Sequence, residues 1–186
     1  MRLFVAIPVP PLLSEIFVPI QYELVATQAP IKLVNAGSMH LTLLFLGEVK
    51  KEAISSIIQR LEHIAATTHP FFLSCHGLGC FGSNSSPSVI WAGIAPSEQL
   101  LALFMQIRTA LADVKVDDYS SPHPHITLAR VRSQSKKKEI LATINFYKSV
   151  HFGDFFVSSF VLYESRLTLG RSVYVARKTL FLGKSL

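Results

Sequence analysis

The sequence predicts an α+β fold with two lobes related by a pseudo-two-fold axis, each combining an antiparallel sheet with helices, and an active site in the cleft between them. The first observation behind this prediction is a tetrapeptide pattern that occurs once in each half of the 186-residue chain. Both copies, His40–Leu43 and His125–Leu128, read histidine, apolar residue, threonine, apolar residue. The second observation is that strand-like and helix-like segments follow one another in the same order in the two halves, as an internal duplication would produce.

The spacing of matching residues supports this duplication. The separation along the chain is 85 residues for two pairs and 84 for a third: Phe4 and Val89, His40 and His125, Phe71 and Phe155. We therefore predict one bilobal domain over residues 1–186. It would consist of a first repeat at about 1–80, a second repeat at about 88–160 and a C-terminal hairpin at about 160–183.

Hydrophobic periodicity predicts the elements of the first half. Strands are expected at residues 3–8, 31–34, 40–46 and 71–75, and helices at 10–27 and 51–67. Gly47 is expected to end the third of these strands. The Gly/Ser/Asn-rich segment 77–88 is expected to be a loop that joins the two halves.

The second half is predicted to repeat this order. Strands are expected at 89–94, 125–131 and 155–159, and helices at about 97–113 and at 136–147. Ser97 is the candidate N-cap of the first of these helices. A final hairpin is expected from strands at 160–164 and 173–181.

The composition indicates a globular protein. Apolar residues make up 49% of the chain and charged residues 16%, which supports a well-buried core and argues against disorder. No window holds the ~20 apolar residues that a membrane-spanning helix needs. Pro8, Pro10 and Pro11 interrupt the apolar N-terminal segment too early for a signal peptide. We therefore expect a cytoplasmic protein without a membrane partner.

Charge and cysteine content argue against a basic nucleic-acid-binding tail, a disulfide-rich protein and a zinc site. The net charge of +6 is compatible with an anionic partner, but it is too small for a basic nucleic-acid-binding tail. Cys75 and Cys80 are too few for a disulfide framework and lack the spacing of zinc ligands. The sequence also lacks a glycine-rich phosphate loop, a Cys/His metal cluster and a serine nucleophile elbow. We therefore expect no metal and no cofactor.

The repeated pattern places an imidazole and a hydroxyl on one face of each strand. Residues i and i+2 of a strand point to the same side, so Thr42 shares a face with His40. Thr127 lies in the same way beside His125. An imidazole titrates near pH ~6.5, so one ring can act as general base while the other acts as general acid. Two such strands across a cleft suit in-line cleavage of a phosphodiester, with hydroxyl donors to its oxygens and no requirement for a metal.

Arg130 is the candidate cation for the phosphate, because a guanidinium can bind a phosphate through two hydrogen bonds. It lies five residues after His125, and strict alternation would place it on the opposite face of the strand. The strand must therefore bend or end near Ala129 for Arg130 to reach the phosphate.

The remaining histidines lack this pattern. Four of them are expected at the surface or in turns: His63, His69, His76 and His151. His123 lies between two prolines and is expected to be in a loop. Three aromatic residues suit a core as well as a surface for base stacking, and both interpretations stay open: Phe4, Trp91 and Tyr174.

At these residues the sequence resembles the 2H phosphoesterase superfamily, in particular the bacterial and archaeal RNA 2′,3′-cyclic phosphodiesterases once called 2′-5′ RNA ligases. Four segments carry the resemblance: residues 2–8, 40–47, 124–130 and 163–174. It implies the bilobal α+β fold and hydrolysis of RNA ending in a 2′,3′-cyclic phosphate to a 2′-phosphate. It also implies that His40 is the proton donor to the leaving 3′-oxygen and that His125 is the proton acceptor from water. The implied phosphate-binding residues are Thr42, Thr127 and Arg130.

Two alternatives to this hydrolase stay open. The same site could join a cyclic-phosphate RNA to a 5′-hydroxyl RNA, as a reversible 2′-5′ RNA ligase. The chain could also be a module that binds nucleotides or RNA ends without turnover. We expect RNA ends or nucleotide 2′,3′-cyclic phosphates as substrates, and a monomer, because the predicted cleft is formed within one chain.

Overall fold

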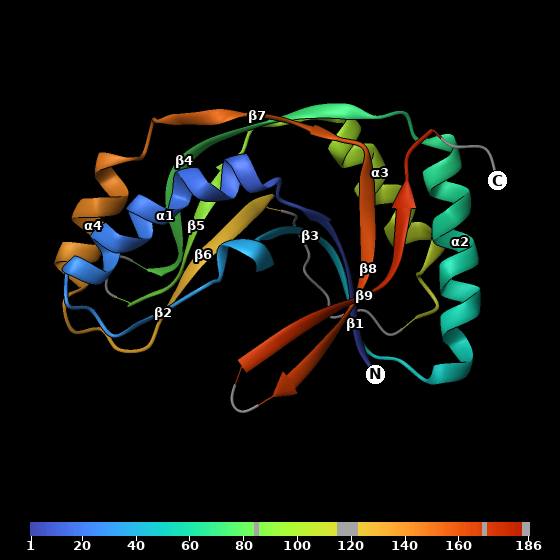
Figure 1. The fold of residues 1–186 in the computed structure, drawn as a ribbon, viewed down its shortest axis with the longest axis horizontal. Coiled ribbons are helices and arrows are strands. Elements are labelled where there is room, and N and C mark those ends of the chain that lie inside the picture. The colour runs from blue at the N-terminus through green and yellow to red at the C-terminus, as the bar shows by residue number, and fades with distance from the viewer. Residues whose placement is uncertain (84–85, 115–122, 169–170, 184–186) are drawn as a thin grey trace.

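The computed structural model describes residues 1–83, 86–114, 123–168 and 171–183 (Figure 1). The described strands are β1 (Arg2–Pro8), β2 (Ile31–Leu33), β3 (His40–Glu48), β4 (Phe71–Ser83), β5 (Ser86–Ile94), β6 (His125–Val131), β7 (His151–Val157), β8 (Ser159–Thr168) and β9 (Arg171–Phe181). The described α-helices are α1 (Pro11–Ala26), α2 (Ile54–Thr67), α3 (Glu98–Ala110) and α4 (Lys137–Phe146). These strands pair antiparallel in one sheet.

The sheet consists of two halves that meet at a narrow junction. Its spatial order is β7-β4-β5-β6-β3-β1-β8-β9, with β2 beside β6. At the centre, β3 and β6 share one register pair, Leu41 with Ile126. Helices α1 and α4 pack on the half that contains β4 to β7, whereas α2 and α3 pack on the half that contains β3, β8 and β9 (Figure 1). The predicted bilobal α+β fold is confirmed.

Each lobe is built from both parts of the chain. The chain passes from β1 to α1, which packs on β6 and β7 of the other lobe. It passes from β5 to α3, which packs reciprocally on β3 and α2. The strand β4 follows α2 but pairs with β5 and β7. The lobes therefore do not coincide with the linear halves of the chain, and the duplicated repeats at about 1–80 and 88–160 stay a prediction.

Two predictions in which glycine residues were expected to interrupt a strand are wrong. The segment 77–88 is not a loop, because β4 and β5 extend into it from both sides. Gly79 lies within β4 opposite Trp91 of β5, and the indole ring occupies the space that a side chain at Gly79 would fill. Gly47 does not end β3, which continues past it. Its positive φ of 64° accompanies an irregularity in the pairing with β1 instead.

The other elements match the predictions, with differences at their ends. The strand β7 begins at His151 rather than at residue 155, and β8 and β9 are longer than the predicted hairpin strands. A 3₁₀ turn at Lys51–Ala53 precedes α2. The hydroxyl of Ser97 accepts a hydrogen bond from the amide of Leu100 at 3.2 Å, so Ser97 is the N-cap of α3 as predicted.

The helices bury one apolar face each, and a single apolar core extends through both lobes. Buried side chains recur three or four residues apart, which is the spacing of one helical face. In α1 these side chains are Leu13, Phe17, Ile20 and Leu24, and in α2 they are Ile57, Leu61 and Ile64. None of the helices in the described ranges is long and apolar enough to span a membrane.

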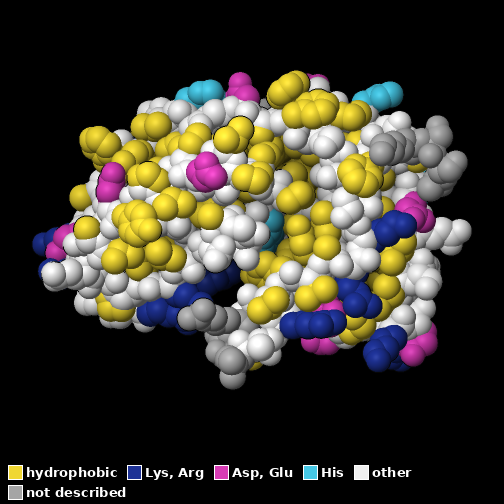
Figure 2. All heavy atoms as spheres, in the orientation of Figure 1, with side chains coloured by type: hydrophobic (Ala, Val, Ile, Leu, Met, Phe, Trp, Pro, Cys, Tyr) yellow, Lys and Arg dark blue, Asp and Glu magenta, His cyan; other side chains and the backbone are white. Residues whose placement is uncertain are grey.

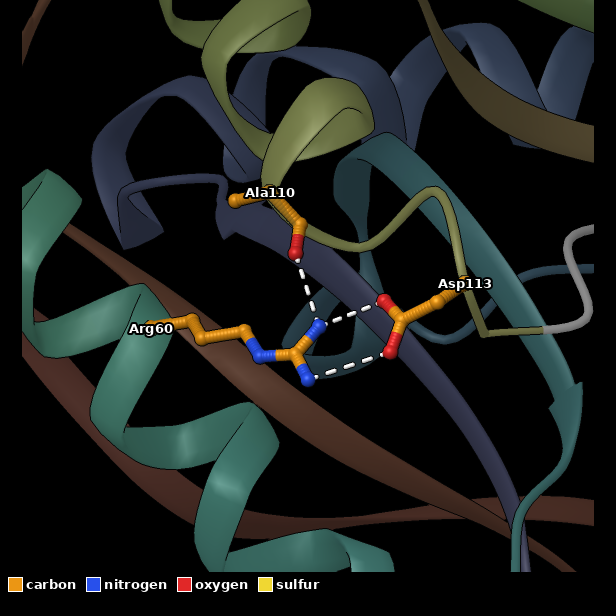
Figure 3. Close-up of polar contacts among 3 residues, drawn as sticks. All are labelled: Arg60, Ala110 and Asp113. Atoms are coloured by element: carbon orange, nitrogen blue, oxygen red, sulfur yellow. Dashed lines mark hydrogen bonds and ion pairs between the residues drawn. The ribbon is translucent and has the colours of Figure 1, made fainter.

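Arg60 of α2 holds the C-terminal end of α3. Its guanidinium donates a hydrogen bond to the carbonyl oxygen of Ala110 at 3.0 Å and forms an ion pair with Asp113 (Figure 3). The last carbonyl groups of a helix have no partner within the helix, so Arg60 satisfies one of them. The hydrogen bond from Arg60 also holds the pKa of Asp113 below its ordinary value. The contact fixes α3 against α2, and Phe104 of α3 lines the cleft between the lobes.

Candidate active site

The five residues predicted for the site line one cleft between the lobes, with a volume of about 1090 Å³. They are His40 and Thr42 of β3 and His125, Thr127 and Arg130 of β6. The neighbouring apolar residues are buried in the core: Leu41, Leu43, Ile126 and Leu128. Alternation along each strand therefore gives a polar face toward the cleft and an apolar face toward the core.

A β-bulge turns Arg130 toward the cleft. Thr127 and Ala129 pair with consecutive residues of β5, so Leu128 between them is an extra residue on β6. Leu128 and Ala129 are both buried, and the alternation of faces is inverted after them. Arg130 therefore lies on the same side as Thr127. The bend near Ala129 that the sequence required is supplied by this bulge.

The same bulge occurs in β3. Leu43 is the extra residue in the pairing with β1, and Leu43 and Leu44 are both buried. Phe45 therefore faces the cleft at the position that corresponds to Arg130 on β6, 85 residues later in the chain. The site is symmetric in its histidines and threonines but asymmetric in charge, because one of the two equivalent positions holds a cation and the other a phenyl ring.

Backbone hydrogen bonds set the tautomer of both catalytic candidates. Nδ1 of His40 lies 2.8 Å from the carbonyl oxygen of Ser38, and Nδ1 of His125 lies 2.7 Å from the carbonyl oxygen of His123. A carbonyl oxygen only accepts, so Nδ1 of each ring carries the proton and donates it. Nε2 of each imidazole is then the atom that can take or give a proton in the cleft. In both strands the accepting carbonyl belongs to the residue two positions before the histidine, so the two imidazoles are held in equivalent ways.

Burial lowers the pKa of both imidazoles below the ordinary value of 6.5. The hydrogen bonds to the two carbonyl oxygens oppose this shift. The positive charges of His125 and Arg130 lower the pKa of His40 further, and those of His123 and Arg130 act on the pKa of His125 in the same direction. A proton on one ring therefore disfavours a proton on the other, which favours a pair with one charged and one neutral member.

Aromatic rings pack against each histidine. The ring centroids of Phe4 and Tyr174 lie 5.0 and 5.1 Å from that of His40. The Phe81 ring lies 4.7 Å from the His125 ring and is perpendicular to it. These contacts restrict rotation of the imidazoles and exclude water from one side of each ring. Both Phe4 and Tyr174 line the cleft, and Phe4 is buried in the core whereas Tyr174 is half-buried.

Two further histidines line the cleft, His76 and His123. His76 is exposed at the surface as expected, and from its position on β4 it also lines the cleft. The sequence gives no signal that His76 lines the cleft, because the pairing of β4 with β5 and β7 is a property of the tertiary fold. His123 lies in a loop as expected, and its ring packs 4.5 Å from that of Trp91. Its position two residues before His125 is the signal that could have placed it on the same face.

The described residues supply no cluster of metal ligands. In this part of the chain, no group of three or more histidine, cysteine, aspartate or glutamate side chains could hold a metal ion. Cys75 and Cys80 are free thiols, and burial raises the pKa of Cys75 to about 12. Cys75 is therefore a protonated core residue at neutral pH.

Comparison with known proteins identifies relatives along most of the chain. The profile of a family described as the 2′-5′ RNA ligase superfamily matches residues 20–167. A protein of Archaeoglobus fulgidus named RNA 2′,3′-cyclic phosphodiesterase is 34% identical over 174 residues, which cover 94% of this chain and 96% of the relative. A protein of the same name from Methanocaldococcus jannaschii is 31% identical over 174 residues, with the same coverage.

Solved structures share the fold. A crystal structure of a Thermus thermophilus protein matches with a TM-score of 0.85 at 28% identity and covers 98% of both chains. The Escherichia coli protein LigT without ligand matches with a TM-score of 0.78 at 28% identity, again over 98% of both chains. LigT has also been crystallised in complex with 3′-AMP, and that structure matches with a TM-score of 0.75, at 28% identity and with 98% of both chains covered.

Proposed function

The chain belongs to the 2′-5′ RNA ligase superfamily, and we propose that it hydrolyses the 2′,3′-cyclic phosphate at the end of an RNA to a 2′-phosphate. The observation that supports this most directly is the pair of imidazoles on two neighbouring strands of the sheet, each with Nδ1 hydrogen-bonded to a carbonyl oxygen. The names of the Archaeoglobus and Methanocaldococcus relatives agree with this activity. We further propose that it acts in the cytoplasm. We also propose that it is a monomer, because the residues of the cleft come from one chain.

The two histidines divide the proton transfers between them. Nε2 of neutral His125 takes a proton from a water molecule, whose oxygen forms the new bond to phosphorus. The bond from phosphorus to the 3′-oxygen breaks, and Nε2–H of protonated His40 gives its proton to that oxygen. The products are a 2′-phosphate and a 3′-hydroxyl. His125 ends protonated and His40 neutral, and exchange of protons with solvent restores the starting pair.

The threonines and Arg130 bind the phosphate in this proposal. The hydroxyls of Thr42 and Thr127 flank the histidines on the cleft face of the two strands and donate to the non-bridging oxygens. The Arg130 guanidinium, turned to the same face by the β-bulge, balances the negative charge. Donors that are already in place stabilise charge in the transition state without reorganisation during the reaction.

The direct test is incubation of the protein with an oligoribonucleotide that ends in a 2′,3′-cyclic phosphate, together with a 5′-hydroxyl RNA. We expect a 2′-phosphate terminus, and the rate should be unchanged by a metal chelator. If the main product is instead a joined RNA with a 2′-5′ linkage, the main reaction is ligation and not hydrolysis. Binding of a 2′-phosphorylated nucleotide without turnover of any cyclic phosphate would show that the protein is a binding module and not an enzyme.

The rate should depend on pH as a bell-shaped curve with its maximum below pH 6.5. The active form needs neutral His125 and protonated His40, and the pKa of both is lowered from 6.5. Rising pH removes the proton from the acid, and falling pH protonates the base, so kcat/KM declines on both sides. A kcat/KM profile of wild-type protein measures this, with circular dichroism over the same range as the control for folding. A maximum above pH 6.5 would contradict these two pKa directions.

A further inference from the structure

We infer that Lys32, Arg130 and Arg132 form a cationic path that binds the phosphodiester backbone of the RNA as it leaves the cleft. The inference rests on the proposed function and adds to it a preference for oligonucleotides over cyclic mononucleotides. The path begins at Arg130 in the site and continues outward along β2 and the end of β6. We name these three residues the exit path.

The backbone places the three side chains on one face. Lys32 of β2 lies directly opposite Arg130 of β6, and opposite residues of an antiparallel pair share a face. The amide of Arg132 donates to the carbonyl oxygen of Pro30 at 2.7 Å, so the ladder continues one residue beyond β6. Arg132 is two residues from Arg130 and therefore points the same way, on the order of 6.6 Å further along the strand.

The intervening residues support this alternation. Ile31, Leu33 and Val131 pack against the apolar core, so the residues between and beside them face away from it. Val34 lies two residues after Lys32 and lines the cleft. The face that carries the exit path is thus continuous with the wall of the active site.

The charge on this face suits an anion. Among the described residues, no carboxylate forms an ion pair with Arg130 or Arg132, and both side chains are exposed. Figure 2 shows Lys and Arg side chains gathered over β2 and β6, at the edge of the hollow in which a histidine is visible. A guanidinium without a carboxylate partner is available for bidentate binding of a phosphate.

The path lies at one end of the seam between the lobes. At the other end, Phe45 and Gly47 occupy the positions that correspond to Arg130 and Arg132, 85 residues earlier in the chain. Because β3 and β6 are antiparallel around the pair Leu41 and Ile126, His40 lies at the end of the seam next to β2. His40 gives its proton to the 3′-oxygen in the proposed mechanism, so the ribose and the RNA attached to it lie at the same end as the exit path.

The test compares one oligoribonucleotide ending in a 2′,3′-cyclic phosphate with the corresponding cyclic mononucleotide. We expect R132Q and K32Q each to lower kcat/KM for the oligonucleotide by about tenfold and to leave kcat/KM for the mononucleotide unchanged. Each change should also reduce the slope of log kcat/KM against log salt concentration for the oligonucleotide by about 0.7. The conservative R132K should keep that slope.

Lys50 supplies the matched control, because it is an exposed lysine that does not line the cleft. K50Q removes the same charge and should change neither substrate's rate. If R132Q and K32Q lower kcat/KM equally for both substrates, or do not lower it for the oligonucleotide, the exit path is wrong and the proposed hydrolase activity is unaffected. Failure of the wild-type protein to hydrolyse either substrate would instead reject the proposed function. Unchanged RNA turnover together with salt-sensitive binding of an acidic peptide would assign the face to a protein partner.

Discussion

Replacement of His125 or His40 by alanine is expected to lower kcat on a cyclic-phosphate RNA by at least about a hundredfold, because each removes one of the two positioned proton-transfer groups. Both rings line the same cleft and both offer Nε2 for proton transfer. The double variant should be little worse than either single variant, since groups that act as a unit are not additive. Single-turnover rates of the three variants measure this.

A substrate with sulfur in place of the leaving 3′-oxygen separates the two roles. A thiol loses its proton near pH ~8.5, so a thiolate can leave without an acid. On this substrate H40A should recover most of its activity, whereas H125A should stay inactive because water still needs a base. Recovery of H125A instead would exchange the assigned roles. H69A is the control, because His69 is exposed and does not line the cleft. Full activity of both H40A and H125A on the natural ester would reject the paired mechanism.

The sequence could predict the candidate site because its histidines and threonines lie in the parts of β3 and β6 that precede the two bulges, where residues alternate regularly. Alternation alone placed Thr42 beside His40, and the second copy of the pattern placed Thr127 beside His125. Alternation failed at Arg130, because one extra residue in β6 inverts the faces and a bulge has no composition of its own.

The sequence could not predict how the lobes share the chain. Helical spacing identifies which face of α1 is apolar, but it does not say which sheet that face covers. The packing of α1 on β6 and β7 is decided by tertiary contacts. Tertiary contacts also decide the structure of β4, whose glycines predict a loop from sequence alone. One of them, Gly79, lies in a strand because the indole of Trp91 on β5 occupies the space of a side chain there.

The substitution G79A is expected to damage both stability and catalysis. A Cβ at Gly79 would overlap Cη2 of Trp91, closer than real contacts allow, so the indole or the backbone must move. Among the described residues, the buried Nε1 of Trp91 has no hydrogen-bond partner, so packing alone fixes the ring. We expect a loss of about 1–3 kcal/mol in the free energy of unfolding, which urea titration measures.

We expect a loss of catalysis as well, because Trp91 packs against the residue that positions His125, the proposed general base. Its ring packs 4.5 Å from the ring of His123, whose carbonyl oxygen accepts the hydrogen bond from Nδ1 of His125. A displacement of about 1 Å at a catalytic group can cost up to about a hundredfold in rate, so kcat of G79A should fall clearly. Adding W91F gives the new methyl group more room and should restore part of both losses.

Gly37 provides the matched control for this substitution. A Cβ there would lie 3.5 Å from Oδ1 of Asn35, an ordinary contact, so G37A should leave stability and kcat close to those of the wild type. If G79A behaves like G37A, Trp91 can move at no cost and does not position His125. If G79A loses stability but keeps its full kcat and pH profile, the indole supports the fold alone. Loss of both, with partial recovery in the double variant, would link this glycine in β4 to the general base two strands away.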